Sequence, residues 1–206
     1  MKNILILGAT GTFGTALTER LSREKKSKLT LFSRHASSIY TGSENITVID
    51  GDAENIEELQ KVVKGQDVVY CAIGGDLLPK IAINLVATMS ACNVERLIFM
   101  GAVGIYNEIP DEIGSEDNVD NEPAQIPNRQ AVDVIENSNL NYTVLRPGYL
   151  REGVENDFVL TVKGEPAKGN ITTIQSLVNL ATHLIQDETM YSRESVSITK
   201  DAKKEV

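Results

Sequence analysis

Three glycines near the start of the chain have a spacing that could support chemistry. Gly8, Gly11 and Gly14 follow the apolar run at residues 4–7 and precede an amphipathic stretch with helical spacing. The first glycine would permit a sharp turn, the second would let a ligand approach the backbone, and the third would let the helix pack closely on the strand. A strand, glycine turn and helix in this order are typical of a site for the pyrophosphate of a dinucleotide.

Polar groups of the same turn could complete a phosphate site. Thr10 and Thr12 offer hydroxyl donors, and a helix that begins near Thr12 would direct free N–H groups at an anion, helped by its dipole. The spacing is GxxGxxG rather than the GxGxxG of many dehydrogenases. The alternative interpretation is a tight turn between strand and helix that binds no ligand.

The second predicted strand ends in LTLFSRHAS. In dinucleotide-binding folds, an acidic residue at this place binds the ribose 2′-hydroxyl of NAD. Ser33 and Arg34 stand there instead, and the planar guanidinium group is suited to a 2′-phosphate. The sequence therefore predicts that NADP(H) is favoured over NAD(H), the alternative being an exposed surface arginine.

Asp52 follows the third predicted strand in the segment IDGDAEN. With Ala53 beside it, its carboxylate could accept a hydrogen bond from the amino group of adenine. Asp52 could also cap the helix that follows, because aspartate is a preferred N-cap residue. The two roles are compatible.

Strands and helices must bring these residues together. Most of the apolar runs are continuous rather than alternating, as in strands buried on both faces of a parallel sheet. The predicted strands span residues 4–7, 29–33, 46–50, 68–72, 97–100, 142–146 and 195–199. Between them lie helical patterns, the clearest formed by Leu78, Ile81, Leu85, Met89 and Cys92. This alternation predicts an α/β fold: a Rossmann-type, doubly wound, mainly parallel sheet with helices on both faces.

Composition excludes several classes of protein. The 206 residues predict one domain, and the net charge of −9 argues against nucleic acid or an anionic membrane surface as a partner. Cys71 and Cys92 lie among apolar residues at a spacing that matches no metal motif, so we expect no metal site. No apolar stretch approaches the ~20 residues of a membrane span. We therefore expect a cytoplasmic protein and make no prediction of its oligomeric state.

Several segments in order resemble one family. ILGATGTFG, FSR, DGDAEN, VVYCAIGG, VERLIFMGAVGIY and LNYTVLRPGYL are similar to the atypical short-chain dehydrogenase/reductases, in particular the small NAD(P)H-binding group that includes flavin/biliverdin reductases and NmrA-like proteins. The resemblance covers essentially the whole chain. It implies that adenosine and phosphates lie near Gly8, Thr10, Gly11, Thr12, Phe13, Gly14, Ser33, Arg34, Asp52 and Ala53. It also implies that the nicotinamide end lies near Ala72, Ile73, Gly74, Gly101, Ala102, Pro147 and Gly148.

The catalytic groups usual in that superfamily are absent from the sequence. Its reductases use serine, tyrosine and lysine, with the last two as YxxxK at the start of a helix, for general acid catalysis. Aligning that helix through Ser138 puts Ala124 at the tyrosine position and Asn128 at the lysine position. Where relatives often have two serines, this chain has Gly101 and Ala102. Arg129, beside the lysine position, could be a displaced substitute or part of a solvated helix face.

The absence of the triad fits hydride transfer to an acceptor that needs no built-in acid. We therefore expect an NADPH-dependent oxidoreductase that reduces a small planar acceptor of flavin or quinone type, by holding donor and acceptor close. The alternative is a non-catalytic NADP-binding regulator, as the NmrA-like resemblance allows. A nucleotide-sugar epimerase or dehydratase is a weaker alternative, because it requires the missing tyrosine and lysine and a larger substrate part than residues 147–206.

Residues 105–128 are predicted to form a long loop without regular structure, beginning where the nicotinamide is expected. Tyr106 matches a tyrosine common in relatives, and we expect it to shape the acceptor pocket together with Ile105 and Ile109. The alternative is an aromatic side chain that covers the edge of the core. The acids of the loop would repel anionic acceptors; they are Glu108, Asp111, Glu112, Glu116, Asp117, Asp120 and Glu122.

Overall fold

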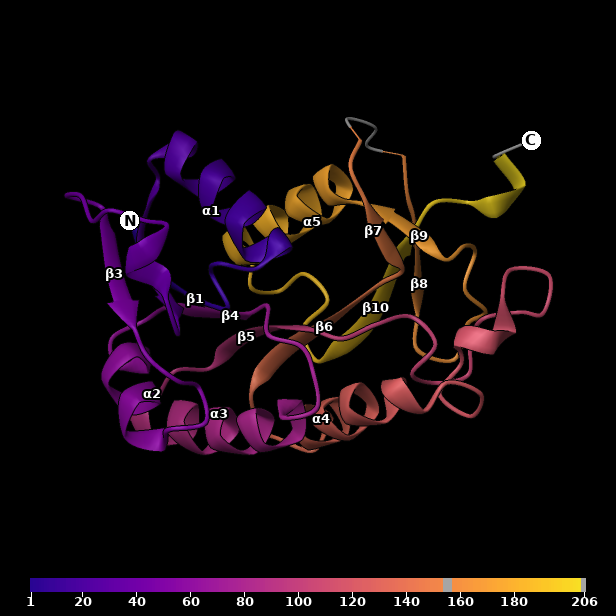
Figure 1. The fold of residues 1–206 in the computed structure, drawn as a ribbon, viewed down its shortest axis with the longest axis horizontal. Helices are drawn as coiled ribbons and strands as arrows, with labels where there is room; N and C mark the ends of the chain where they lie inside the picture. The colour runs from indigo at the N-terminus through magenta and orange to yellow at the C-terminus, as the bar shows by residue number, and fades with distance from the viewer. Residues whose placement is uncertain (154–156, 205–206) are drawn as a thin grey trace.

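An eight-stranded sheet lies at the centre of the computed structural model, which describes residues 1–153 and 157–204 (Figure 1). The strand order is β3-β2-β1-β4-β5-β6-β10-β8, and every pair is parallel except β10 with β8. The strands are β1 (Lys2–Leu7), β2 (Ser27–Ser33), β3 (Ile46–Asp50), β4 (Val68–Cys71), β5 (Arg96–Met100), β6 (Asn141–Pro147), β8 (Val159–Val162) and β10 (Glu194–Thr199). Strand order reverses between β1 and β4, which confirms the predicted doubly wound fold.

Helices cover both faces of the sheet. In the view of Figure 1, α1 (Thr12–Glu24) and α5 (Ile174–Gln186) lie above it, and α2 (Ile56–Val63), α3 (Leu78–Cys92) and α4 (Ile126–Glu136) lie below it. The helix α3 packs between α2 and α4, while α1 packs on α5. In the described residues, no helix has the length and apolar character needed to cross a membrane.

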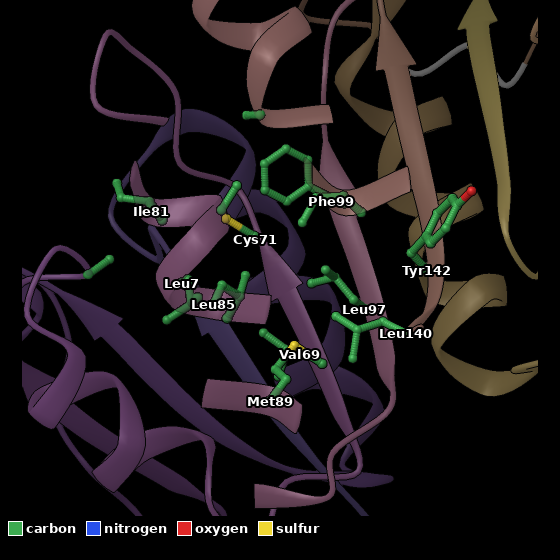
Figure 2. Packing of buried hydrophobic residues seen from close by; sticks show 14 of the residues in the cluster. Leu7, Val69, Cys71, Ile81, Leu85, Met89, Leu97, Phe99, Leu140 and Tyr142 are labelled. Atoms are coloured by element: carbon green, nitrogen blue, oxygen red, sulfur yellow. The ribbon is translucent and has the colours of Figure 1, made fainter. Parts of the chain in front are cut away.

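Side-chain alternation explains why the central strands β1, β4 and β5 are mostly apolar. Ile4 and Ile6 join the cluster under α1 and α5, while Leu5 and Leu7 join the cluster that faces α2, α3 and α4. Figure 2 shows this second cluster, in which Leu7, Val69 and Leu97 of the sheet meet Leu85 and Met89 of α3. Burial on both faces positions the carboxyl ends of the strands along one edge.

The sequence did not predict three of the strands. β7 (Tyr149–Arg151) and β9 (Ile171–Thr173) form a small parallel sheet, and β8 is the antiparallel edge strand of the large one. All of β7 is exposed, so it lacks the apolar run that marked the other strands. These strands belong to the predicted substrate-side part at about 147–206, of which residues 154–156 and 205–206 lie outside the described residues.

The predicted loop at 105–128 contains more structure than expected. Two short 3-10 turns occur at Ser115–Asp117 and Pro123–Gln125, and α4 begins at Ile126. A proline lies in the first turn of α4, where its missing N–H leaves no helical bond unmade. The irregular segment therefore ends at Gln125, and the prediction that it continues to residue 128 is wrong.

Candidate functional site

A cavity of about 320 Å³ opens at the carboxyl ends of β1, β2, β3 and β4. It adjoins the point where the strand order reverses, which is where open α/β sheets bind ligands. The sequence-predicted residues that line it are Gly8, Thr10, Gly11, Ser33, Arg34, Asp52, Ala53, Ala72, Ile73 and Gly74. The fold thus brings together residues from four separate strand ends.

The glycine turn has the geometry that its sequence suggested. Gly8 has a φ of +78°, a conformation that favours glycine, and its N–H donates to the Phe32 carbonyl at 2.9 Å. A Cβ at Gly14 would lie 2.3 Å from the Gly8 carbonyl oxygen, so only glycine permits this close approach. A Cβ at Gly11 would meet only the Gly8 oxygen, at 3.4 Å, and Gly11 faces the cavity. Gly8 and Gly14 therefore shape the turn, whereas Gly11 leaves its ligand side open.

The helix α1 begins directly after this turn. Gly11 is its N-cap residue and makes no side-chain cap, so N–H groups of the first turn are available to an anion. Thr12 is exposed, whereas the Phe13 side chain is 5% exposed and stacks on Tyr70 with ring centroids 5.4 Å apart. Phe13 can therefore meet a ligand only through its main chain. The Thr10 N–H donates to Ser33 Oγ at 3.2 Å, which joins the turn to the end of β2.

The end of β2 presents an available cation. Arg34 is exposed and lines the cavity, and within residues 1–153 and 157–204 its guanidinium group makes no hydrogen bond or ion pair. His35, which follows it, lines the same cavity. A 2′-phosphate could therefore meet the Arg34 donors without displacing another partner.

Asp52 was expected to bind adenine, to cap the helix that follows it, or to do both, and its local hydrogen bond is different from a helix cap. Its Oδ1 accepts from the Glu54 N–H at 2.9 Å, which closes a turn before α2. The N-cap of α2 is Asn55, whose side chain accepts from the N–H groups of Glu57 and Glu58. The alternative that Asp52 caps this helix is therefore wrong, because the chain makes one more turn first.

A second hollow of about 350 Å³ lies farther along the same edge, beyond β5 and β6. Ala102, Pro147 and Gly148 line it, as do Ala124 and Asn128 at the positions of the lost tyrosine and lysine. No hydroxyl or amine stands at these three positions of Ala102, Ala124 and Asn128. The hollow thus lies where the resemblance places the reacting groups, without the side chains of the usual reductase.

The other two predicted glycines of this region are packed into the fold. Gly101 is buried, and a Cβ there would lie 3.2 Å from Val144 and 3.4 Å from Val132, in the core beside α4. A Cβ at Gly148 would lie 2.3 Å from the Asn170 main chain. The Gly148 N–H donates to Thr172 Oγ1 at 2.8 Å. Gly148 therefore permits the close approach of the segment that contains β9.

Asp117, one of the acids expected to face the acceptor, meets two polar residues at the second hollow that sequence reasoning missed, Tyr149 and Asn170. The Tyr149 hydroxyl donates to Asp117 Oδ1 at 2.7 Å, and Asn170 Nδ2 donates to Asp117 Oδ2 at 2.5 Å. The hydrogen bond to Asp117 raises the pKa of Tyr149 above its ordinary value. The only sequence signal was the position of Tyr149 directly after the RPG element.

Tyr106 lies at a different place from the one expected. It lines a separate hollow with Glu108 and Pro110, and its hydroxyl lies 2.7 Å from Glu136 Oε1 and 3.1 Å from Ser195 Oγ. Three cations flank the ring at 4.6–4.9 Å; they are Arg129, Arg146 and Lys163. Arg129 also pairs with Asp133 at 2.7 Å, which leaves it occupied on the helix surface.

The predicted apolar partners of Tyr106 are core residues. Ile105 and Ile109 are 0% and 3% exposed, so neither can contact an acceptor in the second hollow. Ile109 instead borders the separate hollow beside Tyr106. That these residues shape an acceptor pocket therefore stays a prediction, and the second hollow is not that pocket.

Glu108 is also buried rather than exposed. It forms an ion pair with the fully buried Arg146, and its Oε2 accepts from the Tyr106 N–H at 2.8 Å. Arg146 Nε also donates to Ser195 Oγ at 3.0 Å. The charge of Glu108 is thus balanced by Arg146 inside the fold, and the prediction that Glu108 repels anionic acceptors is wrong. Of the acids named for that role, Asp117 and Glu122 line the second hollow.

Cys71 offers no reactive thiolate. Burial raises the pKa of the Cys71 thiol to about 12, so it stays protonated. Cys92 is half-buried, and both cysteines are free. In the part of the chain that the structure describes, no group of three or more His, Cys, Asp or Glu is arranged to hold a metal ion.

These features define a Rossmann-fold nucleotide-binding protein: a doubly wound sheet, a glycine turn that opens a helix, and a cavity at the switch point. A family model described as NAD(P)H-binding matches residues 8–188, and the chain belongs to this family. No curated protein matches the chain.

Solved structures agree with this assignment. A Rossmann-fold NAD(P)-binding family protein from Shigella flexneri is 35% identical, over 98% of this chain and 95% of that chain, with a TM-score of 0.84. A short-chain dehydrogenase/reductase (wide type) from Veillonella parvula DSM 2008, in complex with NADP, is 28% identical over 98% of this chain and 95% of that chain, with a TM-score of 0.89. The resemblance to atypical short-chain dehydrogenase/reductases is confirmed, and the chain is oxidoreductase-like.

A more distant neighbour shares the fold alone. ChuY, an anaerobillin reductase from Escherichia coli O157:H7, is 16% identical over 97% of this chain and 98% of that chain, with a TM-score of 0.82.

Proposed function

We propose that the protein is an NADPH-dependent oxidoreductase that transfers hydride to a small planar acceptor of flavin or quinone type. The observation that carries the proposal is the second hollow, which continues the edge occupied by the nucleotide cavity but has Ala102, Ala124 and Asn128 at the positions of the missing triad. A ketone or sugar substrate needs a group that donates a proton to its oxygen. A flavin or quinone can take its proton from water, so the residues present suffice for it.

The residues of the first cavity fit a dinucleotide. The open side of Gly11 admits a pyrophosphate, the first turn of α1 offers N–H donors, and Arg34 offers its exposed guanidinium group to a 2′-phosphate. When bound, the reduced nicotinamide supplies a hydride together with its electron pair. The protein would act by holding the acceptor close to the ring and by excluding other orientations.

NADPH oxidation in the presence of riboflavin, FMN, menadione and a ketone panel tests the proposal. We expect turnover with planar acceptors and none with simple ketones. The control is the Gly11→Val variant, in which NADPH binding should be lost and turnover should disappear with it. Tight NADPH binding without turnover of any acceptor would contradict the proposal.

That outcome would favour the second candidate, a non-catalytic NADP-binding regulator. The observation in its favour is the same lack of a hydroxyl or amine group at the three triad positions, Ala102, Ala124 and Asn128. Both candidates require nucleotide binding, so only turnover distinguishes them. The nucleotide-sugar epimerase or dehydratase has no support from the second hollow, since both proton-transfer positions are empty of acid–base groups.

A further inference from the structure

One exposed aromatic side chain borders the second hollow. Tyr149 is 61% exposed, although it follows directly after the buried end of β6. Figure 1 shows β7, which begins with Tyr149, leaving the end of β6 and running beside β9. Pro147 and Gly148, the expected wall of the nicotinamide site, come immediately before it and line the same hollow.

The Tyr149 ring is held in place at its far end. Its hydroxyl donates to Asp117, and Asp117 is in turn held by the amide of Asn170 at 2.5 Å. An exposed side chain ordinarily changes rotamer freely, and ordering it on binding costs free energy. Because both bonds already fix the ring, it can present one face to a ligand without that cost.

The charges around the ring are of one sign. Asp117 and Glu122 line the hollow, and among the residues that the structure describes no lysine, arginine or histidine lines it. An anion placed there would meet carboxylates without a compensating cation. The volume of about 350 Å³ falls in the range of small-molecule sites, which is roughly 300–1,000 Å³.

We propose that Tyr149 is the platform on which the planar acceptor stacks, and that Asp117 makes the site select neutral acceptors over anionic ones. The inference rests on the proposed function in placing the acceptor beside the nicotinamide. It assigns the two properties to residues that lie on different segments and that meet only in the folded chain.

A proton-donating role for the Tyr149 hydroxyl is disfavoured by the same geometry. The hydroxyl points its proton at a carboxylate, and a phenolate formed there would lie beside the charge of Asp117. A stacking ring and a general acid differ in what they require. Phenylalanine can replace a tyrosine that only stacks on the ligand. Replacing a tyrosine that acts as a general acid with phenylalanine lowers kcat by about 10²–10⁴.

A riboflavin titration of the NADP⁺-saturated protein tests the platform without turnover. Binding is measured by the quenching of flavin fluorescence. We expect Tyr149→Ala to raise the Kd of riboflavin about fivefold to tenfold and Tyr149→Phe to raise it by less than about threefold. Leu150→Ala is the matched control, because the next residue of the strand points to the opposite face. It should leave the Kd unchanged, and all variants should retain their NADP⁺ affinity.

Riboflavin and FMN share one ring and differ in a phosphate, so they isolate the effect of charge. We expect Asp117→Asn to lower the ratio of the FMN Kd to the riboflavin Kd about threefold to tenfold. An asparagine still offers an oxygen to the Tyr149 hydroxyl. Asp111→Asn removes the same charge from an exposed residue of the same segment, outside the lining of the hollow, and should leave the ratio unchanged.

The outcomes separate this inference from the proposed function. Riboflavin binding that depends on Tyr149, without NADPH oxidation, supports the platform and contradicts the oxidoreductase. Turnover in a protein whose riboflavin affinity is unchanged by Tyr149→Ala supports the oxidoreductase and overturns the platform. Failure of the parent protein to bind riboflavin also overturns it, as does an equal shift of the FMN ratio in Asp111→Asn and Asp117→Asn.

Discussion

Individual side chains at the sheet edge divide into those that hold the fold and those that face the cavity. Gly14 and Gly8 are constrained by backbone contacts, whereas Gly11 and Arg34 have free space or free donors toward the ligand. This division decides which substitutions should affect binding and which should affect stability. Two predictions belong to this scale.

Replacing Arg34 with alanine should remove the expected preference for NADP(H). Charge-assisted hydrogen bonds of this kind contribute about 1.5–3 kcal/mol, so the preference over NAD(H) should be about tenfold to a hundredfold in the parent protein and close to one in the variant. Titration of both nucleotides measures it. Lys28→Ala is the control, an exposed cation on β2, the strand that precedes Arg34, that does not line the cavity. Equal affinities in the parent protein would contradict the prediction.

Gly11→Val and Gly14→Ala should fail in different ways. Gly11 has an ordinary φ of −73° and a Cβ there has room, so its variant should fold but block the pyrophosphate and lower NADPH affinity by more than about tenfold. At Gly14 the added methyl meets backbone at 2.3 Å, which should reduce the free energy of unfolding by about 1–3 kcal/mol. Urea unfolding and NADPH titration separate the two effects. A Gly11→Val protein that binds NADPH normally would show that the turn is only structural.

At the scale of elements, the segment from Ile105 to Gln125 is attached to the far end of the sheet. Arg146 of β6 pairs with Glu108, and Ser195 of β10 bonds the same arginine. Asn118 bonds both the N–H and the carbonyl of Ile109, at 3.0 and 2.9 Å. The segment is therefore anchored from within, and its outer part carries Asp117 to the second hollow.

Breaking the buried ion pair should strongly destabilise the protein. Glu108→Ala leaves the guanidinium of a fully buried Arg146 without its counter-charge, which typically costs about 3–5 kcal/mol. Urea unfolding gives the free energy of unfolding. Glu116→Ala, an exposed acid of the same segment, should change it by less than about 0.5 kcal/mol. Equal, small effects of the two substitutions would show that the pair contributes little.

At the scale of the whole molecule, the two hollows lie side by side along one edge of the sheet, at the carboxyl ends of its parallel strands. The first uses the ends of β1 to β4, and the second uses those of β5 and β6. An extended dinucleotide that binds along this edge would contact both halves of the sheet. Such a ligand binds the folded state and not the unfolded chain, so it should stabilise the whole domain.

Saturating NADPH should raise the Tm measurably. At a concentration about 100 times the Kd, binding adds about 2.7 kcal/mol to the free energy of unfolding. For a domain of this size, each kcal/mol corresponds to about 2–4 °C, so a rise of roughly 5–11 °C is expected in a thermal melt. The Gly11→Val variant should show no rise. A similar rise in that variant would indicate binding elsewhere.

The local elements of the first site could be read from the chain alone. Apolar runs mark β1, β4 and β5 because those strands are buried on both faces, and spacing marks Leu78 to Cys92 as α3. The Gly8 turn and the end of β2 at Arg34 follow from the same local patterns. Residues that the sequence predicted around the nucleotide accordingly meet in one cavity.

The second site was decided by contacts between distant segments. No local sequence pattern near Tyr149 predicts its hydrogen bond to Asp117, and none near Glu108 predicts its ion pair with the buried Arg146. The first pair joins β7 to the segment after β5, and the second joins that segment to β6, so both form only in the folded chain. The sequence by itself determined the elements and the glycine turn, since these depend on neighbouring residues. Tertiary structure decided which acids are buried and which aromatic ring faces the hollow, because burial depends on strand order and packing.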